Sequence, residues 1–282
     1  MGEDHQCVSR PTDPRPIPVC DDGRRRFLMY EDYVAYPKRA ASFGRPLASF
    51  LALSALWCLL LLLFNRFPQI DLSVAGSVFT NGPCASADPV GDVCGMFGYD
   101  RDRLFVNLRS ITLVLPYIAV VVLLAVIYLS WRKLGPHWRT PKVNQCVAAL
   151  LSLALGCGVI VNLILKAFSG RPRPRDTDLF GGVFNFVEAG SFAGQCLKNC
   201  SFISGESSSA GWLLCLVLLL PPRWRLPLGV PLAVASIIMP TMRVLTGAHY
   251  LSDAVLGWLL SLVIFAAMLT VFEIFGPRSQ RP

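Results

Sequence analysis

Long apolar blocks separated by short polar segments dominate this 282-residue chain. A helix that rises about 1.5 Å per residue needs roughly 20 apolar residues to cross a hydrocarbon core of about 30 Å. Six stretches approach this length and predict membrane-spanning helices at residues 46–64, 110–131, 144–168, 207–221, 226–248 and 252–275. The limits of the fourth and fifth are the least defined, because prolines end the fourth and interrupt the fifth. The predicted fold is therefore all-α: a polytopic membrane protein built as a six-transmembrane-helix bundle.

The composition supports this fold class. The chain is 54% hydrophobic and 16% charged, with a mean hydropathy of +0.52. These values exclude a disordered chain, a collagen-like repeat and a small secreted domain held by disulfides. The net charge of +8 would suggest nucleic-acid binding in a soluble protein. In a polytopic chain, basic residues first indicate cytoplasmic loops and anion sites, so no nucleic-acid partner is expected.

Basic residues also predict the domain organisation and its orientation. Residues 1–45 form a basic, loosely ordered tail without a cleavable signal peptide, residues 46–275 the six-span domain, and residues 276–282 a second tail. Sixteen basic residues lie on the side of the two tails and ten on the opposite side. Since cytoplasmic loops carry an excess of Lys and Arg, both termini are expected in the cytoplasm.

Cysteines provide an independent indication of orientation. Cys84 and Cys94 lie in the first outward loop, and Cys196 and Cys200 lie in the second. Paired thiols in exposed loops fit an oxidising compartment. The local pairs Cys84–Cys94 and Cys196–Cys200 are favoured among the three connectivities, because each closes a short loop. Four free thiols remain the alternative.

A cluster of cations lies at the end of the third predicted span and contains Lys166, Arg171, Arg173 and Arg175. Such closely spaced charges repel one another unless an anion is held between them. An anion-binding site is therefore predicted at the outward end of this span. The alternative is a basic boundary that anchors the helix by snorkelling.

A second polar pattern, Ser204-Gly205-Glu206, directly precedes the fourth span. A Ser-Gly turn that opens a helix directs backbone N–H groups and the positive end of the helix dipole at one point, where an anion can bind. By itself, however, the pattern is also that of an ordinary N-cap formed by Ser204 or Ser207.

The third pattern, Arg243-x5-His249-x3-Asp253, lies between the fifth and sixth spans. If the last helix begins near His249, the two residues four apart share one face. A carboxylate that accepts from the imidazole Nδ1–H fixes the tautomer and leaves Nε2 free as a base or nucleophile. The alternative is a structural His–Asp pair that caps the helix.

Together, Lys166-x6-Arg173-Pro174, Ser204-Gly205 and Arg243-x5-His249-x3-Asp253 resemble the three-part signature of the type 2 phosphatidic acid phosphatase superfamily, which includes the six-span lipid phosphate phosphatases. The resemblance covers about residues 100–275. Each part alone is weakly specific, but their order, spacing and position at helix ends are specific in combination.

The resemblance implies a role for each matching residue. Lys166, Arg173 and Arg243 would bind the substrate phosphate, Ser204 and the Gly205 backbone would cradle it, His249 would be the nucleophile, and Asp253 would orient that histidine. Two positions depart from the pattern. Glu206 replaces the usual histidine, and we expect it to serve as the proton donor to the leaving group or as the base for water. Met242 replaces the usual serine, which removes a minor hydroxyl contact.

The predicted activity is metal-independent hydrolysis of a lipid phosphate through a phosphohistidine, with no cofactor. A phosphoryl group in transfer spreads negative charge over its equatorial oxygens, and the predicted cations and N–H groups would stabilise that charge. The substrate would be lipid A or another envelope lipid, in a bacterial inner membrane with a periplasmic active site. A phosphotransferase that uses a hydroxyl acceptor and a catalytically silent lipid-phosphate-binding relative are the alternatives. The oligomeric state is left open.

Overall fold

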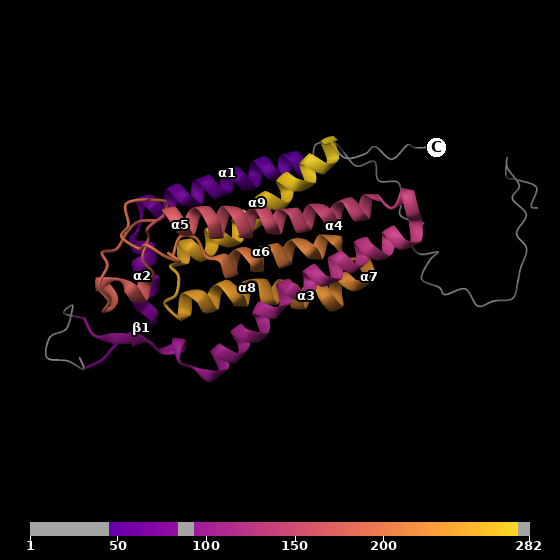
Figure 1. Ribbon diagram of the computed structural model, residues 1–282. Helices are drawn as coiled ribbons and strands as arrows, with labels where there is room; N and C mark the ends of the chain where they lie inside the picture. The colour runs from indigo at the N-terminus through magenta and orange to yellow at the C-terminus, as the bar shows by residue number, and fades with distance from the viewer. Residues whose placement is uncertain (1–44, 84–92, 276–282) are drawn as a thin grey trace, which may run out of the picture. The chain divides into compact units, whose positions relative to one another are not determined.

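The computed structural model describes residues 45–83 and 93–275 (Figure 1). Apart from Arg45, the predicted tails at 1–45 and 276–282 lie outside these residues, as does Cys84. The described residues are mostly helical, with one two-stranded hairpin. The predicted all-α fold class is therefore confirmed.

Within the described residues, five helices are long and apolar enough to cross a membrane. Two of them contain π-helical turns between α-helical parts: α4 (Pro141–Ser152), η4 (Leu153–Leu165) and α5 (Lys166–Phe168) in one, and α7 (Pro222–Trp224), η8 (Arg225–Gly229) and α8 (Val230–Leu245) in the other. The remaining three are α1 (Arg45–Arg66), α3 (Arg103–Leu134) and α9 (Leu251–Phe275). The chain is thus an integral membrane protein.

The fourth predicted span is shorter than the others. It consists of α6 (Gly205–Leu216), with 12 residues, and the 3₁₀ helix η7 (Val217–Leu219), with 3. Together they fall short of the roughly 20 residues that a hydrocarbon core requires. The count of six spans therefore stays a prediction.

Polar caps set the helix limits more closely than apolar composition does. The predicted second span begins at residue 110, but α3 begins at Arg103, because the Asp102 side chain accepts from the backbone N–H groups of Leu104 and Phe105. In the same way, the Thr140 hydroxyl caps α4 by accepting from Val143 N at 3.3 Å. Both helices therefore start directly after polar N-cap residues that lie outside the apolar blocks.

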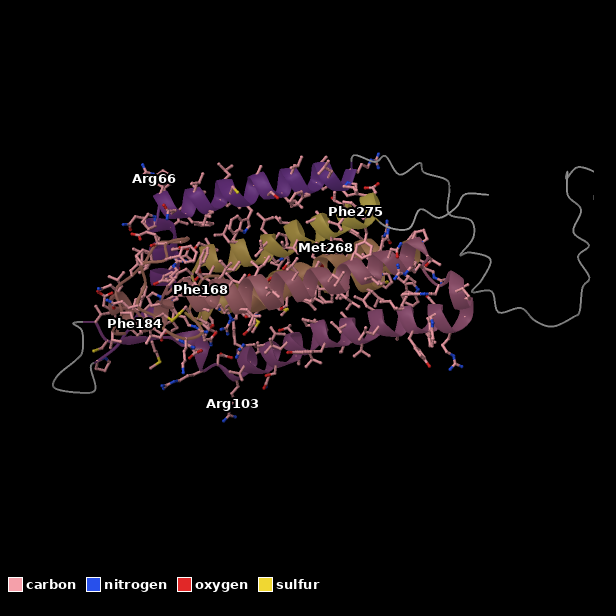
Figure 2. The ribbon with its side chains drawn as sticks, turned by 45° about the horizontal axis from the view of Figure 1, so that its top comes forward. Arg66, Arg103, Phe168, Phe184, Met268 and Phe275 are labelled. Carbon is pink, nitrogen blue, oxygen red and sulfur yellow. A yellow bond between two sulfur atoms is a disulfide. The ribbon has the colours of Figure 1, made fainter. Side chains whose placement is uncertain are left out.

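Several short elements gather at one end of the bundle, which we call the site end (Figure 1). They are α2 (Gln69–Val78), the antiparallel strands β1 (Phe79–Asn81) and β2 (Gly95–Phe97), and the 3₁₀ helices η2 (Gly98–Asp100), η5 (Pro174–Asp176) and η6 (Asp178–Phe180). In Figure 2, Arg66, Arg103, Phe168 and Phe184 lie towards this end and Phe275 towards the other. The connection between α3 and α4, which contains the 3₁₀ helix η3 (Gly135–His137), lies at the far end.

The helices α6 and α9 pack closely in the core of the bundle. A Cβ on Gly211 would lie 2.2 Å from the Trp258 carbonyl oxygen, so only glycine permits this backbone approach. The Ser208 and Ser261 hydroxyls hydrogen-bond across the same interface at 2.7 Å. Small residues and hydroxyl pairs are the usual means by which helices associate in a membrane.

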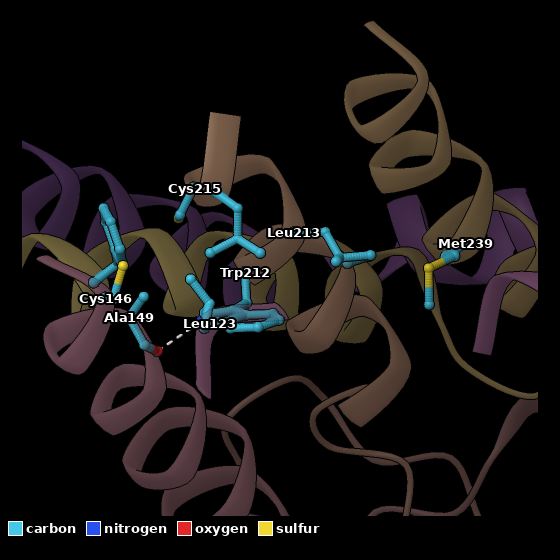
Figure 3. Packing of buried hydrophobic residues seen from close by; sticks show 10 residues of the cluster. Leu123, Cys146, Ala149, Trp212, Leu213, Cys215 and Met239 are labelled. Atoms are coloured by element: carbon cyan, nitrogen blue, oxygen red, sulfur yellow. Dashed lines mark hydrogen bonds between the residues drawn. The ribbon is translucent and has the colours of Figure 1, made fainter. Parts of the chain in front are cut away.

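Trp212 joins α6 to α4. Its ring is buried in a hydrophobic cluster, and its Nε1 donates to the Ala149 carbonyl at 2.8 Å (Figure 3). A buried indole N–H needs such a partner. Although α6 is short, packing on several sides therefore fixes the position of its N-terminus at the site end.

Candidate active site

The three polar patterns of the sequence meet at the site end. Lys166 lies in α5, Ser204 caps the start of α6, and Arg243 lies in the last turn of α8. The backbone N–H of His249 donates to the Arg243 carbonyl at 3.1 Å, and that of Ser204 donates to the Asp253 carbonyl at 3.1 Å. The bond between Ser204 and Asp253 joins the second pattern to the third across 49 positions of the sequence, 253 minus 204.

His249 lies in the turn before α9, which begins at Leu251. The sequence pattern places His249 and Asp253 on one helix face only if the helix begins near His249. The His249 ring is 2% exposed. The Nδ1 atom lies 2.9 Å from the Ser201 carbonyl oxygen and 3.9 Å from Asp253 Oδ2. Because a carbonyl can only accept, we infer that Nδ1 carries the proton and that Nε2 has a free lone pair. Burial lowers the pKa of His249 to about 4, against the opposing effect of Asp253, so the ring is neutral at pH 7.

Asp253 therefore acts on the histidine less directly than the sequence had indicated. The nearest acceptor of the imidazole proton is the Ser201 carbonyl, and the Ser201 hydroxyl donates to Asp253 Oδ2 at 2.5 Å. The same Oδ2 accepts from Tyr250 N at 3.1 Å. Ser201 carries no motif signal in the sequence, and it is a site residue that only the structure identifies.

Arg171 holds the other side of Asp253. It is fully buried, with Nη1 2.6 Å from Asp253 Oδ1 and Nη2 2.8 Å from Asp71 Oδ2. Its guanidinium also stacks over the Tyr250 ring at 4.4 Å. Burial by itself would lower the pKa of Arg171, but the charges of Asp253 and Asp71 outweigh it and raise the pKa. The arginine therefore remains charged.

Asp71 completes this buried network from α2. Its Oδ1 accepts from Ser252 N at 2.8 Å and so caps the start of α9. Burial raises the pKa of Asp71, while Arg171 opposes the shift. The sequence contains no local signal for this residue, because its partners lie 100 and 181 positions away.

The three predicted phosphate-binding cations lie within electrostatic range of one another. Charges on Arg243 and Arg173 both act on the imidazole. The Lys166 ammonium faces the start of α6, since a Cβ on Gly205 would lie 3.3 Å from Nζ. Burial lowers the pKa of Arg173, whose Nη2 donates to the Asn199 carbonyl at 3.1 Å. The anion site itself stays a prediction.

Arg243 has an unsatisfied donor. Among the side-chain atoms buried in the described part of the chain, only its Nε and the Ser207 hydroxyl lack a hydrogen-bond partner. A buried guanidinium N–H without an acceptor is costly, and a bound anion would supply one.

Ser204 has the capping role that the sequence left open as an alternative. Its hydroxyl accepts from Ser207 N at 3.3 Å. The N–H groups of the first turn, including that of Gly205, remain directed out of the helix end. The backbone of this turn, more than the serine hydroxyl, is therefore suited to hold a phosphate.

Glu206 forms an ion pair with an arginine that the sequence patterns do not include. Arg109 of α3 donates to both carboxylate oxygens, at 2.7 and 3.1 Å, and Arg243 Nε lies 3.6 Å from Oε1. A guanidinium has only donors, so this geometry requires the carboxylate form of Glu206.

Cys196 and Cys200 are joined by a disulfide. The other predicted pair includes Cys84, which lies outside the described residues, so that pairing stays a prediction. Within residues 45–83 and 93–275, no three His, Cys, Asp or Glu side chains are grouped to hold a metal ion.

Comparison with known proteins places the site within a matched region. The family model described as "PAP2 superfamily" matches residues 146–276. A "Lipid A 4'-phosphatase" of Rhizobium leguminosarum is 43% identical over 218 residues, which cover 77% of this chain and 94% of that protein. A "Lipid A 4'-phosphatase" of Rhizobium etli is 44% identical over 225 residues, or 80% and 88% of the two chains. A crystal structure of a transmembrane PAP2 type phosphatidylglycerolphosphate phosphatase from Bacillus subtilis covers 84% of this chain and 100% of that one, with 16% identity and a TM-score of 0.48.

Proposed function

The chain belongs to the PAP2 superfamily and is a membrane lipid phosphatase, and we propose that it removes a phosphate monoester from lipid A. Two relatives that share 43% and 44% identity over most of both chains carry the name lipid A 4'-phosphatase. The observation that supports catalysis most strongly is the buried Nε of Arg243, which has no hydrogen-bond partner and lies 3.6 Å from Glu206 Oε1, together with the neutral His249.

We propose that His249 Nε2 attacks the phosphorus in line. The N–P bond forms as the P–O bond to the sugar oxygen breaks, and the departing oxygen takes a proton from water. Lys166, Arg173, Arg243 and the first-turn N–H groups of α6 stabilise the charge on the equatorial oxygens. The Ser201 carbonyl, with Asp253 behind it, stabilises the positive imidazole that develops. Water then hydrolyses the phosphohistidine.

Purified protein should release inorganic phosphate from lipid A faster than from phosphatidate, phosphatidylglycerophosphate or a prenyl diphosphate. The measurement is phosphate release in one detergent at equal lipid mole fraction, with the lipid product identified by mass spectrometry. Lipid A that stays fully phosphorylated while another lipid is hydrolysed would contradict the proposed substrate.

Glu206 is proposed as the base for the second step. Its ion pair with Arg109 favours a carboxylate, which can accept a proton from the attacking water but cannot donate one to a leaving group. The alternative, a proton donor to the departing sugar oxygen, requires that this pair separate and the carboxylate become protonated.

Replacement Glu206→Gln separates these roles. If Glu206 is the base, turnover of lipid A and of p-nitrophenyl phosphate should both fall on the order of 10²-fold, and phosphoenzyme should accumulate. If it is the acid, only the lipid should be affected, because nitrophenolate leaves without a proton. Glu188→Gln, an exposed carboxylate in the 169–204 segment, is the matched control. Full activity of Glu206→Gln on both substrates would exclude both roles.

We further propose a bacterial inner-membrane protein with cytoplasmic termini and a periplasmic site. The excess of basic residues in the tails and in the loops on the same side of the membrane supports this orientation. A variant that keeps only Cys7 should resist a membrane-impermeant thiol reagent applied to intact spheroplasts, whereas one that keeps only Cys196 should react. Labelling of Cys7 from outside would invert the proposed orientation.

A further inference from the structure

An open pocket, which we call the cavity, adjoins the phosphate site on the side of Lys166. Its volume is about 350 Å³, and its lining residues are Asn162, Lys166, Ala167, Leu197, Lys198 and Asn199. The size lies in the range of small-molecule sites, about 300–1,000 Å³. Apart from Lys166, none of these side chains has a part in the phosphoryl transfer proposed above.

The cavity wall opposite the helix is the loop closed by the Cys196–Cys200 disulfide, which carries Leu197, Lys198 and Asn199. Asn199 adopts a φ of +52°, in the left-handed region that asparagine tolerates better than most residues. The loop is thus a short, covalently closed element that presents Lys198 and Asn199 to the cavity.

This loop is attached to the segment that carries the catalytic cations. Cys196 N donates to the Gly170 carbonyl at 2.8 Å, and Ser201 N donates to the Arg171 carbonyl at 2.8 Å. Gly170 and Gly194 are in backbone contact, where a Cβ on either would clash. At the tip, the Asn199 carbonyl accepts from Arg173. A ligand in the cavity therefore contacts an element fixed relative to the phosphate site.

The position and chemistry of the cavity indicate its ligand. A phosphate held at Lys166 directs the alcohol that bears it into the adjoining space. Two amides and two ammonium groups line that space beside two apolar side chains. The polar groups can hydrogen-bond the hydroxyl and amide oxygens of an amino sugar, and acyl chains offer them no such partner. Resting on the proposed function, we propose that the Cys196–Cys200 loop forms a headgroup subsite in which Lys198 and Asn199 bind the phosphorylated sugar of a glycolipid.

The test uses Lys198→Gln in the full-length protein. The KM for lipid A should rise about tenfold, with kcat within about twofold of the wild-type value, because a charged hydrogen bond to the bound sugar is lost. The inhibition constant of inorganic phosphate, which lacks a sugar, should not change. Lipid products are followed by mass spectrometry, so that added phosphate does not interfere.

Arg101→Gln is the matched control, since it removes one exposed positive charge near the start of α3 and outside the cavity. It should alter neither constant. An unchanged KM in Lys198→Gln, or an equal rise in KM and in the phosphate inhibition constant, would overturn the subsite while leaving the proposed function intact. A wild-type protein that does not hydrolyse lipid A would overturn both.

Discussion

Replacement of His249 by alanine should lower phosphate release on the order of 10⁴-fold or more, because no other described histidine lies at the site end to form the covalent intermediate. The buried, neutral ring with its proton on Nδ1 has the electronic state that an attacking Nε2 requires. The measurement is single-turnover hydrolysis of a ³²P-labelled lipid phosphate. Quenched wild-type protein should carry acid-labile, base-stable label, and His249→Ala should carry none.

A control variant is available in the same chain. His137 lies in η3 at the opposite end of the bundle, so His137→Ala should retain wild-type turnover and phosphoenzyme. A His249→Ala protein that still forms acid-labile phosphoenzyme would show that another residue is the nucleophile.

Among the substitutions proposed for this protein, Arg171→Met should lower the free energy of unfolding most. Removal of one partner from a buried ion network costs about 3–5 kcal/mol, because the remaining charges stay desolvated and unpaired. Here both Asp71 and Asp253 would lose the guanidinium that lies within 2.8 Å of each. The expected result is a clear decrease in the unfolding temperature in detergent, together with loss of activity as Asp253 and Ser201 shift.

Arg175→Met is the matched control for this prediction. Its side chain is half exposed and lies 3.5 Å from an equally exposed Asp100, an ion pair worth about 0–1 kcal/mol. Addition of Asp71→Asn to Arg171→Met should recover part of the lost stability, since it removes one of the unpaired charges. Equal unfolding temperatures for Arg171→Met and Arg175→Met would contradict the structural role of Arg171.

Much of the candidate site could be read from the sequence because its parts are local. Lys166, Ser204 and Arg243 end or begin apolar helices, and the ends of neighbouring helices in a bundle lie at similar depth in the membrane. The structure adds Arg109, whose ion pair with Glu206 joins residues 97 positions apart. Nothing in the spacing of α3 distinguishes this arginine from its basic neighbours.

The sequence alone determined the helical membrane architecture, because membrane spans follow from apolar length, and it predicted the candidate reactive groups, because the signature residues lie close together along the chain. Only the tertiary structure distinguished the surroundings of Arg171, Arg173 and Arg175, three arginines at alternate positions of the sequence. Arg171 is buried against two carboxylates, Arg173 donates to the Asn199 carbonyl, and Arg175 is half exposed. Their partners come from α2, α9, the 196–200 loop and η2. Burial and partner charge, which depend on packing between distant segments, decide what each identical side chain does.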